Sequence, residues 1–303
     1  MKRLFALILL ITVAVLPIMG EAQDGMKVSS PNGAPGIALA TLAVEAPDNY
    51  TYVAAEAITA EFAAANADFI IAPINAGAKL YKAGKSSYRL AAVVTWGNLY
   101  FASQKEGFTP EVMNGADVTM FGENTINASV ALYALKKNGI VPASIEYLAG
   151  AANTQSLLLT DDNAIVLTAE PALTAAMMKN DRITAFALND MYEKATGFNG
   201  YPQAGLFVNP ETVKNNPEAV EEYIKLAQNA VTLCETDVPG VAEAAVALGI
   251  LPNVKVAEKA IPGCALRFVS AAEAREQVER TAEIDLSQFG GALPADDFYY
   301  AAP

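Results

Sequence analysis

The stretch KVSSPNGAPGIALATL, residues 27–42, decides how this chain begins to fold. Its first four residues can form a strand, and an Ala- and Leu-rich helical pattern starts directly after Pro35. Between strand and helix stand Pro31, Gly33 and Pro35, which make the connection short and stiff. A strand that passes so directly into a helix is typical of a β-α-β unit. The composition of the loop also favours a ligand that approaches its backbone closely.

The same alternation of extended and helical segments continues along most of the chain. A first series has expected strands at residues 27–30, 50–55, 67–73 and 88–97, and an extended run follows at residues 98–104. A second series has expected strands at residues 117–123, 144–150, 164–170 and 183–188. Another extended run covers residues 201–209, and nearly everything after Pro210 has a helical pattern. The sequence therefore predicts an α/β protein with two β-α-β systems and parallel sheets covered on both faces.

The N-terminal segment has the pattern of a secretory signal peptide. Lys2 and Arg3 precede an apolar run from Leu4 to Met19, and small residues follow it. The alternative is a membrane anchor, but this run is shorter than the roughly 20 apolar residues that a spanning helix needs. We therefore predict a cleaved signal peptide over residues 1–22 and a mature protein that is periplasmic or otherwise extracytoplasmic.

Charge and histidine content exclude several functions. The chain carries 33 acidic and 20 basic residues, a net charge of -13, which argues against binding nucleic acid. Histidine is absent, so Ser/His/Asp and Cys/His catalysis and histidine-based metal sites are excluded. Glycine-rich cofactor fingerprints and phosphate-binding loops are also missing. We expect no catalytic residues, no metal site and no cofactor.

Two cysteines, Cys234 and Cys264, are the only thiols in the chain. Two thiols without histidine make a poor zinc site. In an exported protein an even number of cysteines favours a disulfide, so we predict a Cys234–Cys264 bridge. The alternative is two free thiols, because sequence alone does not give the geometry.

Six loops that join a strand to the following segment carry the candidate ligand-binding residues. They cover residues 29–35, 73–77, 95–98, 122–125, 152–154 and 169–171. Helix capping explains the Ser, Thr or Asn of any single loop. Six loops at the carboxyl edges of two sheets favour a shared cleft. The candidate ligand-binding residues are Ser30, Pro31, Asn32, Gly33, Asn75, Thr95, Trp96, Asn98, Glu123, Asn124, Thr125, Asn153 and Glu170.

Three of these candidates have a competing structural interpretation. Trp96, the only tryptophan, either stacks on a ligand or packs as a core aromatic at a strand end. Glu123 and Glu170 stand at expected helix starts, where they either complement the helix dipole or contact a cationic or amine-bearing ligand. None of the six loops contains Lys or Arg, so we predict a neutral or cationic, ring-containing solute. Anions held by backbone N–H groups alone remain an alternative.

The order and spacing of several runs resemble one known family. The runs are SPNGAP (30–35), ADFIIAPINAGAKLYKAG (67–84), AAVVTWGNLYFAS (91–103), FGENT (121–125), LTAEPAL (167–173) and PQAGLFVNPETVKNNPEAVEEYIK (202–225). Together they resemble the extracytoplasmic solute-binding proteins of ABC importers, of the nitrate, sulfonate, taurine and thiamine-precursor type. The similarity extends from about Lys27 to Tyr300. The cysteine and histidine signatures of the related yeast thiamine-pyrimidine enzymes are missing, so that chemistry is not expected.

The resemblance implies the type II periplasmic-binding-protein fold, with two lobes that are each a mostly parallel sheet flanked by helices. Lobe 1 would comprise residues 26–104 and 204–303, and lobe 2 residues 105–203. The segments NLYFAS and AGLFVN would be the crossings between them. The implied function is that of a monomer that captures a small molecule and delivers it to a membrane ABC permease. Alternatives are an exported ligand sensor, or a small-molecule enzyme on the same fold of the menaquinone-precursor type.

N-terminal sequencing of the secreted protein tests the export prediction. We expect the mature chain to begin between Glu21 and Asp24, because the small residues that signal cleavage lie there. A cytoplasmic product that keeps Met1 would contradict the prediction and would favour the enzyme alternative.

Overall fold

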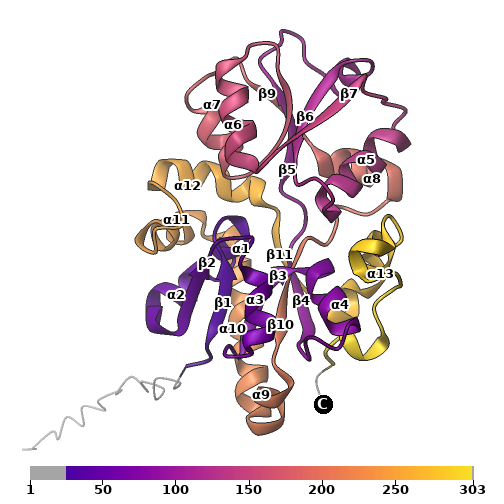
Figure 1. Ribbon diagram of the computed structural model, residues 1–303. Helices are drawn as coiled ribbons and strands as arrows, with labels where there is room; N and C mark the ends of the chain where they lie inside the picture. Colours follow the sequence, from indigo (N-terminus) through magenta and orange to yellow (C-terminus); the bar gives the residue numbers. More distant parts are fainter. Residues whose placement is uncertain (1–24, 302–303) are drawn as a thin grey trace, which may run out of the picture.

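Two β-sheets, each covered by helices, form the two lobes of the molecule (Figure 1). The computed structural model describes residues 25–301. The predicted signal peptide and its cleavage between Glu21 and Asp24 lie outside the described residues. The predicted α/β class with two lobes is confirmed. None of the helices within residues 25–301 has the length and apolar character that a membrane crossing requires.

The first lobe contains a six-stranded sheet in the order β11-β4-β10-β3-β1-β2. Strand β1 pairs in parallel with β2 and β3, whereas β10 is antiparallel to β3 and β4, and β11 is antiparallel to β4. The sheet is therefore mixed. Its strands are β1 (Val28–Pro31), β2 (Tyr50–Val53), β3 (Phe69–Pro73), β4 (Arg89–Thr95), β10 (Ala204–Val208) and β11 (Leu266–Ser270).

The second lobe contains a five-stranded sheet in the order β7-β6-β8-β5-β9. Strand β6 is parallel to β7 and β8, and β5 is antiparallel to β8 and β9. Its strands are β5 (Leu99–Ser103), β6 (Asp117–Phe121), β7 (Ser144–Leu148), β8 (Ile165–Ala169) and β9 (Thr184–Ala187).

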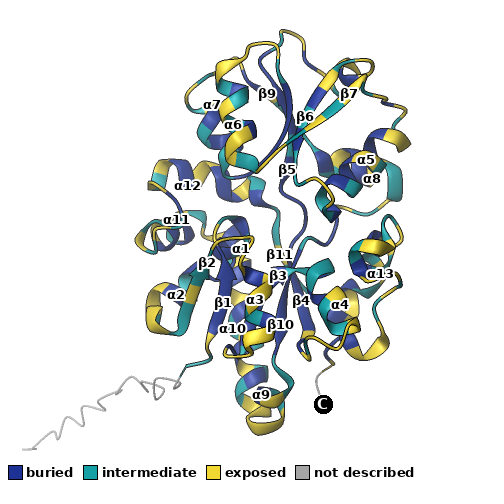
Figure 2. Cartoon of the chain, in the orientation of Figure 1, coloured by how far each residue is buried: buried dark blue, intermediate teal, exposed yellow. Residues whose placement is uncertain are grey.

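Helices cover both faces of each sheet, and the central strands are buried between them (Figure 2). Helix α12 lies between the lobes on the left of Figure 1 and contacts α7 of the second lobe. The helices of the first lobe are α1 (Ala34–Ile37), α2 (Ala40–Glu45), α3 (Ile58–Ala64), α4 (Ile74–Lys82), α9 (Pro210–Asn215), α10 (Pro217–Thr236), α11 (Val238–Ala247), α12 (Val254–Ala260) and α13 (Ala271–Ala282). Those of the second lobe are α5 (Ile126–Lys137), α6 (Ala151–Thr160), α7 (Ala172–Met177) and α8 (Leu188–Thr196).

Local sequence explains where many helices begin. A short polar side chain accepts a first-turn N–H and so replaces a hydrogen bond that the helix cannot make for itself. At α13 the cap is a reciprocal pair, in which Ser270 and Glu273 each bind the other's backbone N–H. The capping residues are Thr125, Asn209, Asp237, Asn253 and Ser270.

The chain passes between the lobes where β4 leads to β5 and where α8 leads to β10. The predicted crossing segments NLYFAS and AGLFVN become the strands that follow these passages. Each enters its sheet antiparallel to the neighbouring strands. The predicted division at residue 104 has to be corrected, because β5 pairs with β8 and β9 and so belongs to the second sheet.

The C-terminal part is less uniformly helical than the sequence predicted. Strand β11 (Leu266–Ser270) adds to the edge of the first sheet beside β4. Its residues alternate only weakly in burial, so their periodicity did not distinguish them from the surrounding helices. Helix α8 (Leu188–Thr196) was likewise not expected after residues 183–188.

The predicted disulfide is not present, since Cys234 and Cys264 are two free, buried thiols. Both belong to one apolar cluster, together with Ile37, Val241 and Ile261. Free cysteine packs as a small apolar residue, so this cluster is filled without a covalent bond. Burial raises the pKa of the Cys234 thiol to about 12 and that of Cys264 well above its usual value. The predicted Cys234–Cys264 disulfide, which rested on the even number of cysteines, is therefore corrected to two free thiols that pack as apolar side chains.

Thiol titration tests this packing. The native protein should react with a thiol reagent at mildly alkaline pH at least about a hundredfold more slowly than the unfolded protein, because burial and the raised pKa deny the reagent a thiolate. Unfolding without reductant should release two thiols. The variant Cys264→Ala, as a control, should release one. Absence of any reactive thiol in unfolded, unreduced wild type would contradict the structure.

Candidate ligand site between the lobes

A cavity of about 350 Å³ lies between the two lobes. It is formed where the loops after β1, β3 and β6 meet the start of β10, so that both lobes contribute to its wall. Its size lies within the range of roughly 300–1,000 Å³ that is usual for small-molecule sites. The lining residues are Pro31, Asn32, Pro35, Ala55, Pro73, Asn75, Ala76, Thr125, Ile126, Asn127, Gln203 and Ala204.

The β1–α1 loop owes its shape to Gly33. This residue has a φ of 94°, in the region that favours glycine, and a Cβ built on it would meet nothing within 4 Å. The glycine is therefore required by the turn rather than by close packing. It directs Pro31 and Asn32 to the cavity while α1 begins with Pro35 in its first turn.

Two helices, one in each lobe, begin at the cavity. Helix α4 starts beside Asn75 and helix α5 beside Thr125. The Ile74 N–H donates to the Gln203 carbonyl at 3.1 Å, and the Thr125 hydroxyl accepts from the Ala128 N–H at 3.4 Å. The remaining first-turn N–H groups have no partner within their helix. Both helix dipoles therefore give the cavity a positive partial charge.

Carboxamide side chains supply the polar groups of the cavity. Asn75 Oδ1 is buried and has no hydrogen-bond partner. Asn127 Oδ1 accepts from the Tyr201 hydroxyl at 3.2 Å and from Gln203 Nε2 at 3.4 Å. Gln203 Oε1 accepts from the Asn98 N–H at 3.3 Å. The site therefore offers one free buried acceptor, Asn75 Oδ1, together with amide N–H donors, and no residue of its lining carries a charge.

The structure brings together only some of the predicted site residues. Pro31, Asn32, Asn75 and Thr125 line the interlobe cavity. The others lie elsewhere: Ser30 and Thr95 are buried, Gly33 shapes its loop, Glu123, Asn124 and Asn153 are exposed, and Trp96, Asn98 and Glu170 lie near the crossings. The sequence analysis missed Asn127 and Gln203. Asn127 lies two residues beyond the predicted loop 122–125, and Gln203 lies within the predicted extended run 201–209, directly before the predicted crossing AGLFVN; these positions were the available signal.

Asn98 and Glu170 form a brace at the first crossing. Asn98 Nδ2 donates to the Glu170 carbonyl at 2.8 Å, and the Glu170 N–H donates to the Asn98 carbonyl at 3.0 Å. The Glu170 carboxylate accepts from the hydroxyl and the N–H of Thr174, at 2.8 and 3.1 Å. Burial raises the pKa of this carboxyl, although the two Thr174 hydrogen bonds oppose the change.

The lobes touch on both sides of the cavity. On one side the Tyr100 hydroxyl donates to the Gly263 carbonyl at 2.9 Å, and a Cβ at Gly263 would come within 3.1 Å of both that hydroxyl and Glu170 Oε1. On the other side the Tyr192 and Thr281 hydroxyls lie 3.1 Å apart, and the Ser129 hydroxyl donates to Asp285 at 2.8 Å. These hydrogen bonds join the two lobes directly.

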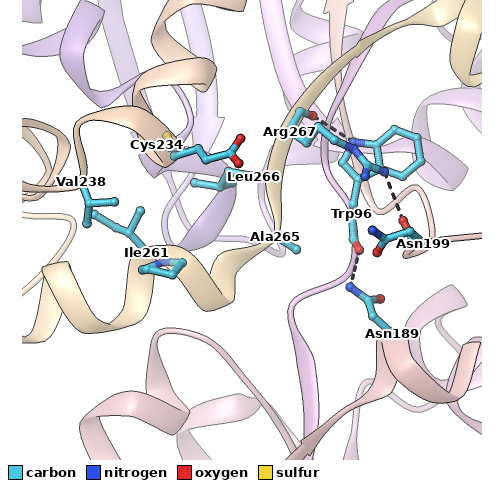
Figure 3. Close-up of a pocket in the computed structure, with 11 residues that line it drawn as sticks. Trp96, Asn189, Asn199, Cys234, Val238, Ile261, Ala265, Leu266 and Arg267 are labelled. Carbon is cyan, nitrogen blue, oxygen red and sulfur yellow. Dashed lines mark hydrogen bonds between the residues drawn. The ribbon is translucent and has the colours of Figure 1, made fainter. Parts of the chain in front are cut away.

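Trp96 lies against a different cavity, of about 400 Å³, which shares no lining residue with the interlobe cavity. Its indole N–H donates to the Arg267 carbonyl at 2.9 Å, and the Arg267 guanidinium lies 4.4 Å from the ring centroid (Figure 3). Asn189 Nδ2 donates to the Trp96 carbonyl at 2.8 Å. The side chain is buried, which fits the packing interpretation of Trp96.

Replacing Glu170 by Gln tests whether its buried charge destabilises the fold. The native pKa is raised above its ordinary value of 4.5, so wild type should lose stability as the pH rises between that value and the native pKa. In Glu170→Gln the amide Oε1 can accept from the Thr174 N–H and Nε2 can donate to the Thr174 hydroxyl, so the variant should be more stable than wild type at pH 7. Urea unfolding should show the difference vanish near pH 4. A Gln variant that is less stable at pH 7 would contradict this account.

No protein-family model and no curated protein matches this sequence. Solved structures do match. A crystal structure of an ABC transporter from Parabacteroides distasonis is 21% identical, with a TM-score of 0.78, over 92% of this chain and 99% of that one. The periplasmic aliphatic sulphonate binding protein SsuA from Escherichia coli is 13% identical, with a TM-score of 0.70, over 92% of each chain.

A Candida albicans protein described as having the generic periplasmic binding protein structural fold also matches. It is 10% identical, with a TM-score of 0.54, over 90% of this chain and 92% of that one. At these identities the comparisons show the fold. The chain has the periplasmic-binding-protein fold, as its resemblance to the solute-binding proteins of ABC importers predicted.

Proposed function

We propose that the protein is an extracytoplasmic solute-binding protein that captures a small molecule between its lobes and delivers it to an ABC import permease. One observation carries the proposal: a cavity of ligand size has walls from both lobes, and no charged side chain lines it. General acid–base catalysis needs titratable groups within hydrogen-bond reach of the reacting atoms. A wall of prolines, alanines and carboxamides suits binding rather than reaction.

Capture follows from the position of the cavity. A ligand held by Asn75 of the first lobe and by Thr125 and Asn127 of the second contacts both lobes only when they are closed. Such a ligand favours the closed over the open arrangement by the difference in its affinity for the two. The crossings at β4–β5 and α8–β10 are the segments about which the lobes would move.

The polar groups of the cavity indicate the chemistry of the solute. The unpaired Asn75 Oδ1 would accept a hydrogen bond from one donor on the solute. The helix N-termini and the free amide N–H groups would donate to acceptors on the solute. Glu123 and Glu170 do not line the cavity, and the helix dipoles disfavour a cation there. Of the neutral and cationic solutes, the cavity therefore favours the neutral class: a compact polar molecule with several acceptors and a flat apolar surface against the prolines. The alternative of an anion held by backbone N–H groups fits the same helix N-termini.

Delivery to a permease rests on the comparisons. SsuA is described as a periplasmic binding protein, and the Parabacteroides distasonis protein as an ABC transporter. The predicted signal peptide agrees with an extracytoplasmic site of action. An exported sensor would use the same cavity and the same closure. A neighbouring permease and ATPase would distinguish the importer from the sensor, and a monomer is expected for either.

Calorimetry with the small molecule that co-purifies with the mature protein tests the cavity. Asn75→Ala removes the free acceptor and should weaken binding by about 1–3 kcal/mol, or roughly 5- to 150-fold. Asn66→Ala is the matched control, because Asn66 is exposed and lies outside the cavity. Equal affinities of wild type and a folded Asn75→Ala protein would place the solute elsewhere.

A further inference from the structure

The cavity beside Trp96 is a candidate for a second, separate ligand site. Its volume of about 400 Å³ is within the range for small-molecule sites. Both lobes and the second crossing contribute to its wall, with Asn189 from α8, Asn199 from the crossing and Arg267 from β11. Figure 3 shows Trp96, Arg267 and Asn199 at one end, and Cys234 and Val238 at the other.

An unpaired cation stands at the first end. The Arg267 guanidinium stacks on Trp96 at 4.4 Å and donates through Nη2 to the Asn199 carbonyl at 3.1 Å. Within residues 25–301 no carboxylate forms a salt bridge with it. Guanidinium has five N–H donors in a planar fork that matches a carboxylate. Donors other than the one used by Asn199 therefore remain for an anionic group of a ligand.

The opposite end is acidic. Glu235 lines the cavity and, among the described residues, has no salt-bridge partner. It stands in the last turn of α10, a helix of 20 residues, whose dipole is negative at that end. The first-turn amide of Gly240 in α11 is already capped by Asp237 at 3.2 Å, so it offers no competing positive site. An amine is the ligand group that this end favours.

The wall between the two ends is largely apolar, with Val238, Ile261 and Leu266 facing the cavity. Beside Trp96, at the Arg267 end, Asn189 Oδ1 is buried and accepts no hydrogen bond. A molecule that fills the cavity would thus meet a cation, an apolar surface and an anion in turn.

We propose that this cavity binds a small zwitterion with a carboxylate at Arg267, an amine at Glu235 and an apolar body between them. The ligand is an amino acid whose amine and carboxylate are separated by an apolar chain. It is held by both lobes and by the second crossing, so its binding depends on the angle between the lobes. The proposal does not depend on the solute of the interlobe cavity, because the two cavities share no lining residue.

Three probes of similar length separate the two charges: 6-aminohexanoate, which carries its amine and its carboxylate at opposite ends of an apolar chain, hexanoate, which lacks the amine, and pentylamine, which lacks the carboxylate. The lone Trp96 reports binding by its fluorescence, and calorimetry provides a second readout. Wild type should bind 6-aminohexanoate at least about tenfold more tightly than either single-charge probe, since each lost ion pair costs about 1.4 kcal/mol or more.

Two variants assign the charges to their residues. Glu235→Gln should bring hexanoate to the affinity of 6-aminohexanoate, and Arg267→Gln should remove binding of 6-aminohexanoate and hexanoate while sparing pentylamine. Glu235 and Arg267 are both exposed, so the variants should remain folded, as circular dichroism can verify. Asn75→Ala, in the interlobe cavity, should leave binding of 6-aminohexanoate unchanged.

Two results would overturn the proposal. One is the absence of any fluorescence change or heat with all three probes at concentrations approaching their solubility. The other is binding of 6-aminohexanoate that survives both charge variants, or that is lost in Asn75→Ala and so occurs in the interlobe cavity. If this proposal fails, the calorimetric test of the interlobe cavity with the co-purified molecule is unaffected, because that test depends on different residues.

Discussion

At residues 95–98 and 197–203 the chain passes from one sheet to the other, and both cavities depend on how closely these two crossings approach. Gly97 and Gly200 both have positive φ, and a Cβ on either would come within 2.5 Å of a neighbour in or next to the other crossing. The Asn98 N–H reaches Gln203 Oε1 at 3.3 Å. Trp96 lines one cavity and Gln203 the other, so the paired crossings form a common partition.

Hydrogen bonds between the lobes stabilise the arrangement that the structure shows. The Tyr100–Gly263 and Tyr192–Thr281 hydrogen bonds join the lobes on opposite sides of the interlobe cavity. Each such bond contributes about 0.5–1.5 kcal/mol, comparable to the few kcal/mol that separate open and closed states of a two-state protein. Modest differential binding by a solute can therefore set the population of closed molecules. The buried Glu170 carboxyl lies within the same contact region as Gly263.

The sequence predicted the fold well because the signal is repeated in every β-α-β unit. It predicted the site in part, since position at a strand end does not fix the direction of a side chain. Asn32 and Asn75 face the cavity, whereas Asn98 turns to the Glu170 carbonyl. Trp96 packs against Arg267, a residue 171 positions away, which no local pattern reveals. The prediction of a Cys234–Cys264 disulfide was wrong for the same reason, because packing between residues far apart in the sequence decides whether two thiols form a bond.

Lobe closure on a bound solute is the central claim, and an inter-lobe distance tests it most directly. Spin labels are attached to Lys85→Cys in the first lobe and to Lys136→Cys in the second, because both positions are exposed. The native thiols are buried and should not be labelled. The distance is measured by electron-spin resonance on protein stripped of its co-purified molecule by unfolding and refolding, and again after that molecule is returned. We expect a broad distribution of inter-lobe distances without the ligand and a single, narrow distribution with it. An identical distribution in both samples, with binding verified by calorimetry, would contradict it.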